Sequence, residues 1–381
     1  MSRANLLELL PSELEDLATS LGAARYRGRQ VASWIFQRGA TDVAAMSDLP
    51  RDFRAALAET HEIELPRVER ATPSADGSLK LVLRLADDAA VQAVLMPDGD
   101  RLTLCVSTQV GCGYACAFCL TGTMGVARDL TASEIVGQFL VAQRLAAKGT
   151  AGDLRRVTHV VYMGMGEPLA NYAATVRSVR LLTDEKAINL SPRKVTMSTV
   201  GLVPGLDRLG KDHLRINLAV SLHAASDEIR SRLMPINKAF PLAELMAACR
   251  RYPLAPRQRI TFEYVLLDGV NDSPEEARKL AKLLRGIKAK VNLIPFNDWP
   301  GSAFRRPAMP RIMGFQEVLL EQGITATMRW SKGEDIGAAC GQLSDVLAGA
   351  KAGSALADGP LLEVAAAPAR RGRTARGRDD G

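Results

Sequence analysis

The spacing of apolar residues changes along the chain. Up to about residue 60 they recur at three- and four-residue intervals, which is typical of amphipathic helices. We expect a first helix near Pro11, with Ser12 as N-cap and Glu15 closing the capping box, and a second that includes residues 30–37. Between residues 79 and 107 apolar and polar residues alternate, which predicts strands over 79–85, 91–96 and 102–106.

From about residue 130 onward, apolar runs alternate with amphipathic segments. The runs predict strands over 157–163, 194–199, 215–221, 260–266, 290–294 and 325–329. The amphipathic segments predict helices over 133–147, 172–184, 242–251, 274–285 and 311–322. Repeated strand–helix units imply an α/β protein with a parallel sheet, either doubly wound or rolled into a barrel. In both forms reactive groups belong at the carboxyl ends of the strands.

The same pattern divides the chain into four regions. We expect a helical accessory domain over residues 1–62, a β-rich connection over 63–101 and the α/β domain over 102–345. The last region, 346–381, is rich in alanine and ends in a basic run, so it has little to bury and is expected to be disordered.

Composition and charge narrow the class of protein. Hydrophobic residues make up 47% of the chain and charged residues 24%, which suits a globular protein rather than a disordered one. The formal net charge of +7 favours an anionic partner such as nucleic acid, although a merely basic soluble protein has the same balance. In the same way, Arg25, Arg27 and Arg29 read as a solvated face or as an RNA contact. No apolar stretch approaches the length of a membrane span, so we expect a cytoplasmic protein.

Three cysteines lie close together just after the first strand of the alternating region. Cys112, Cys116 and Cys119 are separated by three and then two residues. Three thiolates at this spacing can bind three corners of an iron–sulfur cubane and leave one iron open to a small molecule. A zinc site completed by Cys105 or a distant histidine, or a chance group of core cysteines, would also explain them, but spacing and location favour the cluster.

A second motif ends the next predicted strand. Gly164, Gly166 and Glu167 stand in the sequence Met-Gly-Met-Gly-Glu-Pro. Glycines allow a ligand to approach the backbone closely, and a carboxylate balances an ammonium group. On its own the motif does not identify the ligand.

The cysteine triad and this glycine–glutamate–proline segment resemble those of the radical S-adenosylmethionine (SAM) enzymes. Over roughly residues 5 to 345 the chain is similar to one subgroup, the RNA methyltransferases that act on carbon 2 of adenosine in 23S ribosomal RNA and transfer RNA. The matching segments are residues 26–30, 105–112, 195–199, 221–224, 292–297 and 332–343.

The resemblance implies a fold, cofactors and partners. The fold is a partial (βα)6 TIM-like barrel over 102–345 with a methyl-carrier loop near its end. The cofactors are a 4Fe–4S cluster on the three cysteines and SAM. The partners are 23S rRNA, tRNA and an electron donor such as flavodoxin or ferredoxin, and we expect a monomer. The implied SAM pocket consists of Gly166, Glu167, Ser198, Ser221, Leu222, His223 and Asn297.

The resemblance also assigns two further cysteines. Cys340 would carry a methyl group taken from one SAM molecule, and a radical derived from a second SAM would activate that methyl group for addition to the base. Cys105 would then resolve the protein–RNA adduct and leave a disulfide. Two alternatives remain at this point: a related enzyme that methylates carbon 8 of adenosine, and a non-enzymatic zinc- or cluster-bearing RNA-binding module.

One position departs from the subgroup. The subgroup has a glutamate, thought to accept the proton of the RNA base, where this chain has Gln92. An amide cannot act as a carboxylate base. Asp87, Asp88, Asp98 or water could take the proton instead, and the sequence assigns no base.

Overall fold

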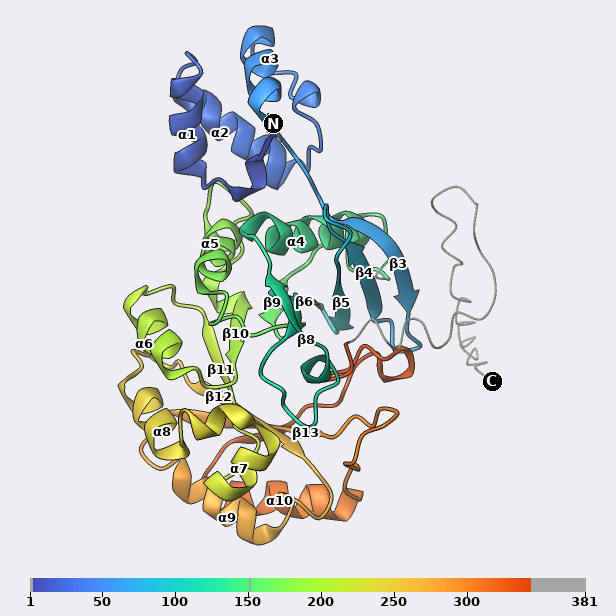
Figure 1. Ribbon diagram of the computed structural model, residues 1–381, viewed down its shortest axis with the longest axis vertical. Helices are drawn as coiled ribbons and strands as arrows, with labels where there is room; N and C mark the ends of the chain where they lie inside the picture. Colours follow the sequence, from blue (N-terminus) through green and yellow to red (C-terminus); the bar gives the residue numbers. More distant parts are fainter. Residues whose placement is uncertain (1–2, 151, 344–381) are drawn as a thin grey trace, which may run out of the picture.

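The computed structural model describes residues 3–150 and 152–343, and a small helical module stands at one end of it (Figure 1). β1 pairs with β2 in parallel, which brings the two ends of the module together. The expected disordered tail, residues 346–381, lies outside the described residues. The elements of the module are β1 (Ala4–Asn5), α1 (Pro11–Ser20), α2 (Tyr26–Ala32), a π-helical turn (Ser33–Gln37), α3 (Arg51–Thr60) and β2 (His61–Glu62).

The start of α1 differs from the prediction. The N-cap is Leu10 rather than Ser12, because the proline that follows Leu10 already occupies the first helical position. The carboxylate that closes the first turn belongs to Glu13, whose Oε2 accepts a hydrogen bond from the Leu10 N–H at 2.8 Å. The predicted second helix is confirmed, but it begins earlier, at Tyr26, and its second half is the π-helical turn.

Glu15 was expected to close the capping box, but it instead joins α1 to the start of α2. Its carboxylate forms ion pairs with Arg25 at 2.9 Å and with Arg29 at 3.4 Å. Arg27 donates hydrogen bonds to Gln30 and to the backbone of the loop that follows α2. These arginines therefore stabilise the packing of the module. The sequence analysis did not predict this role, because it considered only a solvated face and an RNA contact.

The largest sheet in the described residues has ten strands. β3 to β6 form an antiparallel meander, whereas β6 and β9 to β14 run parallel and lie side by side in sequence order. A doubly wound sheet reverses its strand order at a switch point, so this continuous order identifies a partial barrel. The strands are β3 (Arg67–Pro73), β4 (Leu79–Arg84), β5 (Ala90–Asp98), β6 (Arg101–Cys105), β9 (His159–Tyr162), β10 (Val195–Thr199), β11 (Asn217–Ser221), β12 (Ile260–Leu266), β13 (Ala289–Pro295) and β14 (Ala326–Met328).

Helices connect the parallel strands and cover the outside of the sheet (Figure 1). Every strand and helix that the sequence predicted is present, with ends that shift by a few residues. The elements that were not predicted include the polar edge strand β3 and two short helices, α6 and α7. The helices are α4 (Ala132–Ala147), α5 (Tyr172–Thr183), α6 (Val203–Lys211), α7 (Asp227–Leu233), α8 (Leu242–Arg251), α9 (Pro274–Leu283) and α10 (Met309–Glu321). Among the described helices, none has the length and apolar character needed to cross a membrane.

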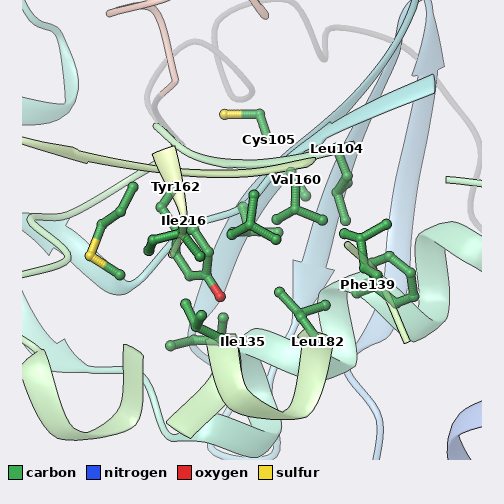
Figure 2. Close-up of a cluster of buried hydrophobic side chains, with 14 of the residues drawn as sticks. Leu104, Cys105, Ile135, Phe139, Val160, Tyr162, Leu182 and Ile216 are labelled. Atoms are coloured by element: carbon green, nitrogen blue, oxygen red, sulfur yellow. The ribbon is translucent and has the colours of Figure 1, made fainter. Parts of the chain in front are cut away.

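The apolar core between the sheet and the helices decides which way the strand residues point. Leu104, Val160 and Tyr162 pack toward α4 and α5, where Phe139 is one of their neighbours (Figure 2). Figure 2 shows the Cys105 sulfur on the opposite side of the strands. Successive side chains of a strand alternate between its two faces, so the packing of Leu104 turns Cys105 toward the barrel interior.

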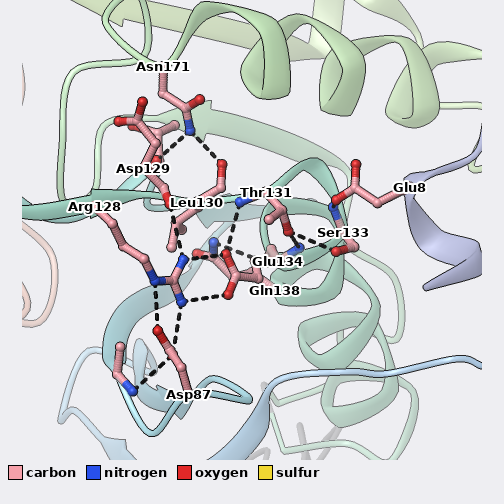
Figure 3. A network of polar contacts seen from close by, with 12 residues as sticks. Glu8, Asp87, Arg128, Asp129, Leu130, Thr131, Ser133, Glu134, Gln138 and Asn171 are labelled. Carbon is pink, nitrogen blue, oxygen red and sulfur yellow. Dashed lines mark hydrogen bonds and ion pairs between the residues drawn. The ribbon is translucent and has the colours of Figure 1, made fainter. Parts of the chain in front are cut away.

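A polar network fixes the amino end of α4 (Figure 3). Arg128, on β8 (Gly125–Asp129), forms ion pairs at 2.8 Å with Asp87 of the β4–β5 turn and with Glu134 of α4. Glu8 of the helical module accepts a hydrogen bond from the Ser133 N–H at 2.7 Å. β8 pairs with β7 (Gln109–Cys112), so the network joins the module and the meander to the ribbon that leads into the cysteine loop.

Candidate active site

A cavity, here called the main cavity, opens at the carboxyl ends of the parallel strands. Of the residues expected in a SAM pocket, Leu222 does not line it, because its side chain is fully buried. The main cavity brings together the other six expected residues, which come from the carboxyl ends of β9, β10, β11 and β13: Gly166, Glu167, Ser198, Ser221, His223 and Asn297.

Glu167 is held rigidly in the wall of the main cavity. Its carboxylate accepts hydrogen bonds from the Val200 N–H at 2.8 Å and the Leu169 N–H at 3.0 Å, and its own N–H donates to Gln109 Oε1 at 2.9 Å. Burial raises the pKa of this carboxyl to about 7. A cationic group beside it would offset that cost of burial, so the site suits the ammonium group of SAM.

The three cysteines of the triad lie together beside the main cavity. Cys112 ends β7, and Cys116 and Cys119 follow in the next loop. Burial raises the pKa of all three thiols, to about 11 for Cys112, and the charges of the three act on one another. Buried thiols of this kind are expected to ionise when a metal group binds them.

The three thiols come from one short segment of the chain. In a cubane with three thiolate ligands, each thiolate binds its own iron and the fourth iron stays open to a small molecule. The triad beside the main cavity suits such a cluster.

Cys340 and Cys105, which were expected to be the carrier and resolving cysteines, both line a second cavity. Cys340, in the segment after β14, lines both this cavity and the main cavity, whereas Cys105 lines only the second. Both are free thiols. Burial and the charge of Cys340 raise the pKa of Cys105 to about 12, and the Arg329 guanidinium opposes that shift. The segment of Cys340 is fixed by Asn297, whose Nδ2 donates to the Cys340 carbonyl oxygen at 3.1 Å.

Comparison with known proteins decides the family. Residues 4–63 match the family model of the ribosomal RNA large subunit methyltransferase N-terminal domain, and residues 106–281 match the radical SAM superfamily. The dual-specificity RNA methyltransferase RlmN of Syntrophobacter fumaroxidans is 49% identical over 331 residues, which are 87% of this chain and 95% of that protein. The chain belongs to the RlmN family. The RlmN of Anaeromyxobacter dehalogenans is 50% identical over 342 residues, 89% of this chain and 91% of its own length.

A solved structure agrees with RlmN membership. The crystal structure of a radical SAM methyltransferase from Sphaerobacter thermophilus, 47% identical, superposes with a TM-score of 0.84 and covers 89% of this chain and 99% of its own. The superfamily is defined by a 4Fe–4S cluster and SAM, so these are the cofactors of this RlmN-family chain.

Sequence reasoning missed two charged residues of the RlmN site. Glu263 on β12 and Arg329 after β14 line the main cavity and form an ion pair at 3.5 Å. Arg329 also lines the second cavity, and the charge of Cys340 acts on it more strongly than any other. A signal for Glu263 was available, because it is the only charged residue in the otherwise apolar run 260–266.

Gln92, the position at which the sequence departs from the subgroup, is fully buried and lines neither of the two cavities. β5 pairs Val94 with Cys105, so Gln92, two residues away, faces the same side of the sheet as both. The acids that the sequence offered in its place, among them Asp87 in its ion pair with Arg128, line neither of the two cavities. The carboxylates that line the main cavity belong to Glu167 and to Glu263.

Proposed function

We propose that this chain methylates carbon 2 of adenosine in 23S rRNA and in tRNA. Relatives that share about half of its residues over nearly their whole length are dual-specificity RNA methyltransferases. The observation that carries the proposal is the placement of Cys340, which lines the main cavity beside Cys119 and the second cavity beside Cys105. A thiol at that junction can receive a group on one side and be attacked on the other.

The cofactors have defined places in this proposal. Cys112, Cys116 and Cys119 hold the cluster, and the main-cavity residues named above, with Glu167 opposite the ammonium group, hold SAM. When bound, the cluster and SAM supply a radical that takes hydrogen from a methyl group. Buried apolar side chains such as Val265 and Phe296 line part of the main cavity.

The two remaining cysteines act in sequence. The Cys340 thiolate attacks the methyl group of SAM, here a substrate, becomes a thioether and releases S-adenosylhomocysteine. After the carrier carbon has joined the base, the Cys105 thiolate attacks the Cys340 sulfur. An S–S bond forms, the S–C bond breaks with its electron pair going to the carrier carbon, and that carbon takes up a proton to become the methyl group of the freed base. Arg329, which lines both cavities, places a positive charge beside both sulfurs. We assign no side chain as proton acceptor, because Gln92 is an amide.

The proposal extends to partners and regions. Residues 1–62 form an accessory domain that contacts RNA, 63–101 a connection, and 102–345 the catalytic barrel with its methyl-carrier segment. The electron donor is a small redox protein such as flavodoxin or ferredoxin, and the enzyme works as a monomer. Free cysteines suit the reducing cytoplasm.

The test uses three variants of the full chain: Cys105→Ala, Cys340→Ala and the double variant. Each is reconstituted anaerobically and incubated with SAM and a 23S rRNA fragment. Cys105→Ala should accumulate a protein–RNA adduct on denaturing gels, and the other two should not. Cys249→Ala is the matched control, because Cys249 is buried in α8 and lines neither cavity.

The same experiment separates the alternatives. A nuclease digest of RNA treated with the unaltered chain, analysed by mass spectrometry, distinguishes methylation at carbon 2 from methylation at carbon 8. A chain that binds RNA but leaves it unmethylated, and that takes up one zinc ion in place of iron and sulfide, would contradict the proposal.

A further inference from the structure

Arg230, on α7, is the largest side chain that is fully buried in the described residues. Four of the five N–H groups of its guanidinium donate hydrogen bonds. Nε donates to the Leu222 carbonyl oxygen at 3.1 Å, and Nη2 donates to the carbonyl oxygens of Val200 at 2.8 Å and Ser221 at 3.2 Å. Nη1 donates to Asn237 Oδ1 at 2.8 Å. The side chain thus joins the ends of β10 and β11 to α7.

The charge of Arg230 has no direct counter-ion. Among the described residues, no carboxylate lies within ion-pair distance of it; Asp227 is reached only through Asn237, whose Nδ2 donates to Asp227 Oδ1 at 2.8 Å. Burying a cation without a partner is unfavourable. The cysteine loop packs directly on α7: the Ala117 N–H donates to the Leu233 carbonyl oxygen at 2.8 Å, and Cys116 belongs to the same buried cluster as Leu233. An anionic group on the cysteine loop would therefore complete this site.

We propose that Arg230 is a positioning residue with two effects: it is the buried counter-charge of the cluster on Cys112, Cys116 and Cys119, and it fixes the strand ends that form the SAM pocket. A cubane with three thiolate ligands carries net negative charge, and that charge grows on reduction. The proposal rests on the cluster-binding role of the cysteines and not on the RNA substrate. The Arg230 proposal can therefore be wrong while the proposed methylation is right, and the proposed methylation can be wrong while the Arg230 proposal is right.

The two effects predict different measurements. A fixed positive charge beside the cluster favours its reduced form, so removing the charge should make the midpoint potential more negative. The carbonyl groups of Val200 and Ser221 belong to residues that line the main cavity. Loss of the hydrogen bonds that hold them should therefore weaken SAM binding, by roughly 2- to 12-fold for each lost bond.

Two variants separate charge from hydrogen bonding. Arg230→Lys keeps the charge but loses the planar fork, so it should retain the potential of the unaltered chain and bind SAM more weakly. Arg230→Gln loses the charge, so it should show a more negative potential and weaker SAM binding. The control is Arg144→Gln on α4, because Arg144 also donates to a backbone carbonyl, that of Gly39 at 2.7 Å, but lines neither cavity.

The measurements are iron and sulfide content, circular dichroism of the apo form, the midpoint potential from an anaerobic optical titration, and SAM affinity by equilibrium dialysis. An Arg230→Gln protein that folds without the cluster but loses iron, while Arg144→Gln retains it, would also support the counter-charge. Equal potentials for Arg230→Gln and Arg230→Lys would overturn the electrostatic effect. Unchanged SAM affinity in Arg230→Lys would overturn the positioning effect.

Discussion

Gly166→Ala tests whether close packing behind the SAM pocket positions Glu167. Gly166 has a φ of +100°, and a Cβ there would lie 2.7 Å from the Gln109 Cβ and 2.8 Å from the Gln109 backbone N. The backbone of one or both residues must therefore move. Gln109 Oε1 accepts the Glu167 N–H, so the shift displaces the carboxylate next to Gly166.

The structure sets the size of the effect. A residue forced into an unfavourable backbone region costs on the order of 1–3 kcal/mol. If the strain is relieved only when the strand end leaves its binding position, SAM affinity should fall by roughly 5- to 140-fold, the equivalent of that energy. Gly99→Ala is the matched control, because Gly99 also has a positive φ, +58°, but a Cβ there would meet nothing within 4 Å.

The assay is equilibrium dialysis of labelled SAM against both reconstituted variants, with iron content measured on the same samples. Gly99→Ala should lose a little thermal stability and keep its SAM affinity. Gly166→Ala should lose SAM affinity at full iron content. If Gly166→Ala binds SAM as tightly as the unaltered chain, the close contact with Gln109 does not position Glu167 and the reasoning is wrong.

Three further predictions concern the cysteine triad, the ion pairs of Glu15 and the thiol of Cys105. Replacing Cys112, Cys116 or Cys119 by alanine should abolish cluster binding and SAM cleavage together, whereas Cys249→Ala should keep both. The iron content of each purified variant tests this prediction. Glu15→Gln should lower the melting temperature at pH 7, and the difference should vanish in acid: hydrogen bonding to Arg25 lowers the pKa of Glu15, so its stabilisation is lost as pH falls through that lowered value. Because burial raises the pKa of Cys105 to about 12, adduct resolution in single-turnover experiments should accelerate about tenfold per pH unit near neutrality, and a flat profile would contradict the assignment.

The barrel was predictable because its strands are buried on both faces and therefore read as apolar runs. The run over 260–266 matches β12 at both ends, and its neighbours differ by a few residues. The location of the site was also predictable, because residues at the carboxyl ends of parallel strands converge at one end of the barrel. Once the strands were placed, Ser198, Ser221 and Asn297 had to face one opening.

The helices α6 and α7 were not predicted because their amino-acid compositions are unusual for helices. α6 contains Gly205, Gly210 and a proline, and α7 is short and mostly charged. Their stability comes from tertiary contacts, which local propensity does not include. Arg230 is the extreme case: an arginine in a charged segment is expected on the surface, and its burial is explained by hydrogen bonds to the carbonyl groups at two strand ends and to Asn237.

The junction of the two cavities depends on chain segments far apart in sequence, and no local pattern encodes it. Met163 after β9, Ile294 on β13, Arg329 after β14 and Cys340 line both cavities, so these side chains form the wall between them. A carrier thiol in that wall faces the cofactor residues on one side and Cys105 on the other. In the proposed function, methyl acceptance and adduct resolution would therefore use one sulfur without a large movement of its segment, and Arg329 would supply the same positive charge to both steps.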